Sequence, residues 1–167
     1  MPEQKRARAK VQPVATGKDA ERQLAGFLAK YTPEIESFAK AVRAKMRAQL
    51  PGVTELVYDN YNALAIGYGP TERASEAIFS IALYPRWVSL FFLQARGLRD
   101  PEGLLRGNGR VVRHIVLQRP NELELPAIRD LMAQAAAGAK VPLDPAVPRR
   151  LLVKSVSARQ RARRPRE

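Results

Sequence analysis

The spacing of apolar residues changes at Pro51-Gly52, and this change constrains the fold more than any other feature of the chain. Before this point, apolar residues recur every three or four positions, as they do on one face of a helix. Thr32-Pro33 divides the region in two, because threonine is a common helix cap and proline is favoured at the first helical position. The two predicted N-terminal helices have these apolar faces: Leu24, Phe27, Leu28 and Tyr31 in the first, and Ile35, Phe38, Ala39, Val42, Met46 and Leu50 in the second.

After Pro51-Gly52 the sequence is made of short runs rich in β-branched and aromatic residues, which favour strands. The predicted strands are residues 55–61, 63–68, 76–83, 87–93 and 111–117. Most of the connectors are too short to hold a helix, which makes neighbouring strands antiparallel. Pro126 then opens a last amphipathic segment, which Gly138 ends. The predicted fold class is α+β, with two N-terminal helices, a five-stranded mostly antiparallel sheet and a C-terminal helix.

The positive charge of the chain is concentrated at its two ends. The whole chain carries a net charge of +13, of which residues 1–17 hold +3, residues 149–167 hold +7 and residues 18–148 hold +3. Segments with few apolar residues and a high net charge cannot form a core, and we predict disorder for them. The predicted organisation is a basic disordered tail at 1–17, an α+β domain at 18–140, a proline-containing linker or docking segment at 141–157 and a basic disordered tail at 158–167. Within the third segment, Leu151–Val156 is expected to add a short strand or to dock on the surface.

Basic tails attract polyanions through charge alone, and such binding is non-specific and sensitive to salt. Neither tail contains an aromatic residue on which a base could stack. We therefore expect weak, non-specific contact with nucleic acid through the tails. The basic N-terminus is not followed by an apolar region of the kind found in secretory signals, and the longest apolar run, Trp87–Leu93, is too short to cross a bilayer. We expect a soluble, cytoplasmic protein with no membrane partner, and the sequence indicates no oligomeric state.

Three segments of the chain resemble the YdhG-like family, whose members are mostly bacterial and are usually described as a domain of unknown function. They read Leu-Val-Tyr-Asp-Asn-Tyr-Asn at 56–62, Tyr-Pro-Arg-Trp-Val-Ser-Leu-Phe at 84–91, and Leu-Leu-Arg-Gly-Asn-Gly-Arg-Val-Val-Arg-His-Ile at 104–115. The resemblance covers about residues 20–137 and implies N-terminal helices, then an antiparallel sheet and a C-terminal helix. The family includes a frataxin-like iron chaperone of bacilli. Iron sites need clustered carboxylates or histidines, and this chain has one histidine, no cysteine and no acidic run, so we predict neither a metal site nor a cofactor.

Arginines and glycines form a candidate anion site between the fourth and fifth predicted strands. Its residues are Arg106, Gly107, Gly109, Arg110 and Arg113. Glycines leave backbone N–H groups accessible, and arginines bind phosphate or carboxylate through two parallel hydrogen bonds. Alternation along a strand places Arg110 and Arg113 on opposite faces, so Arg106 and Arg110 are expected to converge. The alternative is an ordinary glycine turn that leads into a strand.

Five further residues are candidates for a pocket: Tyr58, Asp59, Tyr61, Trp87 and His114. Strand alternation directs Tyr58 to one face and Asp59 with Tyr61 to the other, where Asp59 could act as a general base. The alternative is the end of a strand with half-buried tyrosines. His114 shares its predicted face with apolar residues, which indicates a core histidine more than a catalytic one. Trp87 could stack on a ligand, and we expect it to pack in the core.

The sequence leaves three functions open. The first is a non-enzymatic domain that binds a small ligand or acts as an adaptor, which we prefer because no catalytic pair stands at a recognisable spacing. The second is an enzyme acting on a small anionic substrate through Asp59 or His114, with the arginines near Gly107 holding the anion. The third is an accessory protein associated with nucleic acid through its basic tails.

Overall fold

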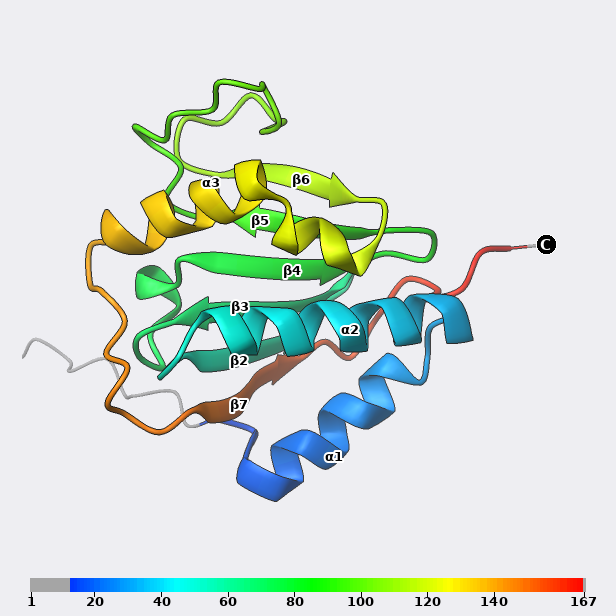
Figure 1. Ribbon diagram of the computed structural model, residues 1–167. Coiled ribbons are helices and arrows are strands. Elements are labelled where there is room, and N and C mark those ends of the chain that lie inside the picture. Colours follow the sequence, from blue (N-terminus) through cyan, green and yellow to red (C-terminus); the bar gives the residue numbers. More distant parts are fainter. Residues whose placement is uncertain (1–12, 167) are drawn as a thin grey trace, which may run out of the picture.

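The structure is a computed structural model that describes residues 13–166. In that part of the chain, three α-helices lie on one face of a seven-stranded sheet, and helices and sheet form two layers (Figure 1). The predicted α+β class is therefore confirmed. The sheet is mixed and larger than expected, so the predicted five-stranded arrangement is wrong.

Two helices form where the apolar spacing predicts them. They are α1, Gly17–Leu28, and α2, Pro33–Gln49. Thr32 caps α2, because its side-chain oxygen accepts a hydrogen bond from the backbone N–H of Ile35 and Pro33 occupies the first turn. The buried residues of α2 face the sheet at helical spacing: Ile35, Ala39, Val42 and Met46.

The five predicted strands are present, and consecutive strands pair antiparallel. They are β2 Thr54–Asp59, β3 Leu64–Gly69, β4 Phe79–Leu83, β5 Val88–Phe92 and β6 Arg113–Leu117. A short 3-10 helix, η1 Ala74–Glu76, lies between β3 and β4, and another, η2 Pro120–Glu124, leads into α3, Pro126–Ala137. Because the turn after β2 and the turn after β4 connect antiparallel neighbours, both lie at the same end of the sheet, which we call the hairpin end.

Two more strands complete the sheet. β7, Arg150–Val156, runs parallel to β2, and β1, Ala15–Thr16, pairs with the other edge of β7. The strand order is β1-β7-β2-β3-β4-β5-β6. Of the two alternatives expected for Leu151–Val156, the structure shows the strand. The prediction of a disordered tail at 1–17 is wrong for residues 15–17, which form β1 and begin α1, and residues 1–12 lie outside the described part of the chain.

Gly52 allows the chain to return to β7. Its φ angle is +77°, and a Cβ atom there would lie 1.9 Å from the backbone oxygen of Asp144. The segment that connects α3 to β7 can pass this point only because the residue has no side chain. The glycine that ends the helical half of the sequence therefore also permits the parallel strand.

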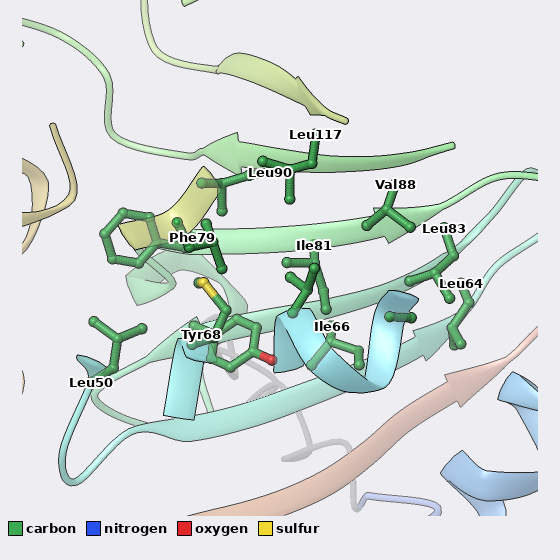
Figure 2. Packing of buried hydrophobic residues seen from close by; sticks show 14 of the residues in the cluster. Leu50, Leu64, Ile66, Tyr68, Phe79, Ile81, Leu83, Val88, Leu90 and Leu117 are labelled. Carbon is green, nitrogen blue, oxygen red and sulfur yellow. The ribbon is translucent and has the colours of Figure 1, made fainter. Parts of the chain in front are cut away.

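The hydrophobic core fills the space between the helices and the sheet (Figure 2). Tyr68, Phe79 and Ile81 from β3 and β4 are fully buried there, and the rings of Phe79 and Phe92 meet edge to face at 5.5 Å. The packing makes the sheet a rigid support for the turns at its two ends.

The C-terminal segment, defined here as residues 157–166, stays on the protein after β7 and crosses the hairpin end (red trace in Figure 1). This differs from the disordered tail predicted for 158–167, since Arg163 is only 5% exposed and the backbone N–H of Arg161 donates to the carbonyl of Tyr61. Glu167 lies outside the described residues.

Candidate nucleic-acid interface

Asp59, the last residue of β2, anchors the C-terminal segment. Its side chain is completely buried, and its Oδ1 accepts a hydrogen bond from Arg163 at 2.9 Å. Its Oδ2 accepts from Lys30 at 2.9 Å and from Gln160 at 2.7 Å. A buried carboxylate is tolerated only when it is paired in this way. The hypothesis of Asp59 as a general base does not fit this arrangement, because both oxygens are occupied.

Further contacts hold the segment along the hairpin end. The backbone N–H of Ser157 donates to the carbonyl of Asp59 at 2.8 Å, and Arg161 donates in the same way to Tyr61 at 2.8 Å. Arg163 also donates to the carbonyl of Asn60. The segment is therefore fixed beside the turn that joins β2 and β3.

Tyr31 ties the helices to the same end of the sheet. Its hydroxyl donates to the carbonyl of Leu83 at 2.8 Å and accepts from the backbone N–H of Leu64 at 3.0 Å. The guanidinium of Arg163 lies 5.8 Å from the ring centroid of Tyr31, within the range of cation–π attraction. Burial raises the pKa of the Tyr31 hydroxyl above its ordinary value.

Two exposed aromatic side chains lie on the hairpin end. Tyr61, in the turn after β2, is 46% exposed, and Trp87, in the turn after β4, is 43% exposed. The guanidinium of Arg161 lies 5.7 Å from the centroid of the Tyr61 ring, and Tyr84 stacks on Trp87 with ring centroids 4.7 Å apart. Each ring is thus held by a partner while much of its surface faces solvent. The core packing expected for Trp87 is therefore wrong, because its side chain lies at the surface.

Exposed arginines lie at the same end of the sheet, and one of them, Arg161, contacts the Tyr61 ring. Four belong to the C-terminal segment, and within residues 13–166 none of the four takes part in an ion pair: Arg159, Arg161, Arg164 and Arg166. Arg86 lies in the same turn as Trp87. Arg119 follows β6, whose Leu117 pairs with Val88 at the start of β5, and it therefore lies at the hairpin end as well. The surface combines flat aromatic rings with positive charge.

The remaining pocket candidates lie elsewhere. Tyr58 is half-buried on the sheet face opposite Asp59, and burial raises the pKa of its hydroxyl. His114 is half-buried and stacks on Phe91 at 5.2 Å, on the face opposite Ile115. The expected placement of His114 on the core face is wrong, because strand β6 directs Ile115 and not His114 into the core.

The arginine loop is also arranged differently from the prediction. Arg106 pairs through its backbone with His114, and Gly107 has a φ of +103° beside the His114 ring. Arg106 and Arg110 line different hollows, whereas Arg110 and Arg113 line the same one. The predicted convergence of Arg106 with Arg110 is wrong because β6 begins at Arg113, which leaves Arg110 in the loop, free of strand alternation. Gly109 is exposed in that loop.

No family model, curated protein or solved structure matches this chain. Within residues 13–166, no helix has the length and apolar character needed to cross a membrane. Among the same residues, no group of three or more histidine or acidic side chains is placed to hold a metal ion. The surface at the hairpin end is therefore interpreted from its own residues.

The sequence alone does not predict this surface, because its parts are far apart along the chain. From the sequence, Tyr61 and Trp87 are separate pocket candidates, and the C-terminal tail contains no aromatic residue beside its arginines. The structure brings the two groups together through Asp59 and Arg163, which are 104 residues apart. No local pattern marks that pairing, although a lone carboxylate at the end of an apolar strand calls for a partner.

Proposed function

We propose that the protein binds single-stranded nucleic acid, without catalysis, at the surface formed by the C-terminal segment and the two turns of the hairpin end. The observation that carries this proposal is the contact of Arg161, in the docked C-terminal segment, with the exposed ring of Tyr61, at the end of the sheet that also exposes Trp87. Proteins that bind single strands combine positive charge along the backbone path with aromatic rings on which bases stack. Both parts are present within one surface.

A single strand fits this surface better than a duplex. Bases in a duplex are stacked on one another, and a ring on a surface turn cannot reach their faces. The four exposed arginines of the C-terminal segment supply the phosphate contacts, which are sequence-independent. The proposal develops the hypothesis of nucleic-acid contact through the tails, with the difference that the segment acts as a fixed part of the surface.

The proposal is tested by the binding of a fluorescently labelled oligonucleotide, followed by anisotropy at fixed ionic strength. We expect single-stranded DNA or RNA to bind more tightly than a duplex of the same length. Tyr61→Ala should weaken single-strand binding by about 1–3 kcal/mol, the range measured when one stacking ring is removed. Val111→Ala, at an exposed position outside the hairpin end, is the matched control and should bind as the wild type does.

Two results would contradict the proposal. One is equal affinity for single strand and duplex, which would indicate binding by charge alone. The other is unchanged affinity in Tyr61→Ala, which would mean that the exposed ring does not contact the bases.

A further inference from the structure

The loop between β5 and β6, residues 93–112, forms a basic hollow (the loop above β6 in Figure 1). It lies at the end of β5 opposite Trp87. Its volume is about 410 Å³. The charged side chains that line it are Arg96, Arg110, Arg113 and Asp100. Ala95, Leu98 and Leu105 supply apolar walls. The hollow is large enough for a small molecule, and its lining contains three cations and one carboxylate.

The loop is held in place by its own hydrogen bonds. The two carboxylate oxygens of Asp100 accept from the backbone N–H groups of Leu104 and Leu105, each at 2.9 Å. The backbone N–H of Ala95 donates to the carbonyl of Val111 at 2.7 Å. Gln134 of α3 bonds both the N–H and the carbonyl of Arg99. These contacts fix the hollow before any ligand arrives, which reduces the entropic cost of binding.

The charges of the hollow do not cancel. Both carboxylate oxygens of Asp100 already accept hydrogen bonds from backbone N–H groups of the same loop, and Asp100 pairs with none of the three arginines among the described residues. Arg113 is half-buried and donates through one terminal nitrogen to the carbonyl of Leu105 at 3.2 Å, while its Nε is buried without a hydrogen-bond partner among the described residues. The hollow therefore has an excess of positive charge, with three arginines against one carboxylate.

We propose that this hollow binds a small molecule through an oxyanion group, either phosphate or carboxylate, held by Arg96, Arg110 and Arg113. Guanidinium groups bind both oxyanions through paired hydrogen bonds, and the apolar walls accept a short carbon skeleton. The site stands on observations separate from those at the hairpin end. It also differs from the site expected from the sequence, because Arg96 takes the place of Arg106.

The test uses inorganic phosphate and, in a second series, citrate, with the full-length protein in buffered sodium chloride at physiological ionic strength. The Nε–Hε resonance of Arg113 in a nitrogen–proton correlation spectrum reports directly on the hollow. We expect this resonance to shift and to saturate with at least one of the two probes. The two series distinguish a phosphate site from a carboxylate site.

Arg110→Ala and Arg106→Ala form a matched pair, because both arginines are exposed in the same loop but line different hollows. Arg110→Ala should weaken binding of the active probe by about tenfold or more, since it removes a charge-assisted contact. Arg106→Ala should change the affinity less than about twofold. Equal effects of the two substitutions, or no shift of the Arg113 resonance with either probe, would overturn the proposal. The Trp87 emission should not respond to either probe, which separates a failure here from a failure at the hairpin end.

Discussion

A buried carboxylate holds the C-terminal segment on the protein. Asp59 is inaccessible to solvent, and Arg163, with a side chain 4% exposed, is its most buried partner. Taking two charges out of water is costly, and removal of one partner leaves the other charge buried without compensation. The ion pair therefore affects the free energy of unfolding mainly when one of its two partners is removed.

Replacing Arg163 with alanine should lower the free energy of unfolding by about 3 kcal/mol, because Asp59 stays buried with Lys30 and Gln160 as its remaining partners. Urea denaturation followed by circular dichroism measures this change. Arg161→Ala is the control, since Arg161 is exposed and should cost less than about 1 kcal/mol. Similar costs for the two substitutions would show that the segment is not anchored through Asp59.

Tyr68 gives the stability of the protein a dependence on alkaline pH. The side chain is fully buried, and burial together with the nearby charge of Glu55 raises its pKa well above 10. In the unfolded chain the same hydroxyl ionises near its ordinary pKa of 10.0, so above that pH only the unfolded state loses the proton. The contribution of Tyr68 is thus complete below pH 10 and is lost as the pH rises toward the folded-state pKa.

Tyr68→Phe removes this contribution to the pH dependence. Between pH 8 and 11 the free energy of unfolding of the wild type should fall more steeply than that of the variant, with the profiles diverging above about pH 10. Chemical denaturation at a series of pH values provides the measurement. Parallel profiles would show that Tyr68 ionises with the same pKa in both states.

At the scale of secondary structure, the elements set by local patterns were predictable and the distant pairings were not. The helices and strands β2 to β6 follow from apolar spacing and from turns such as Tyr84-Pro85-Arg86. The sequence of β7 is consistent with a strand. Its parallel pairing with β2, however, depends on the long connection between the two strands, which no local pattern in the sequence predicts. The extension of the sheet from five to seven strands arose from this non-local step.

In the candidate sites, too, local patterns identify single residues but do not predict which of them lie together. Arg110 and Arg113 are expected on opposite faces of a strand, yet they line the same hollow together with Arg96, which belongs to a loop whose path the sequence does not specify. Strand alternation does not describe the direction of Arg110, because Arg110 precedes β6, which begins at Arg113. Tyr61 and Trp87 were found as aromatic candidates, whereas their relation to the C-terminal arginines required the fold.

For the whole molecule, the position of the charge matters more than its sum. The net charge of +13 would suggest diffuse attraction to any polyanion if it were spread over mobile tails. The structure instead fixes residues 157–166 at the hairpin end, where Arg161 lies against the exposed ring of Tyr61, and a separate group of arginines lines the hollow at the other end of β5. The two groups of arginines thus lie at opposite ends of the sheet.

The most direct measurement of the central claim uses Trp87, which is the only tryptophan of the chain. Its intrinsic fluorescence reports on the hairpin end without a label. If bases of a single strand stack at this surface, titration with an unlabelled single-stranded oligonucleotide should quench the Trp87 emission and saturate with the same dissociation constant that anisotropy gives. Binding seen by anisotropy with no change in the Trp87 emission would contradict the account.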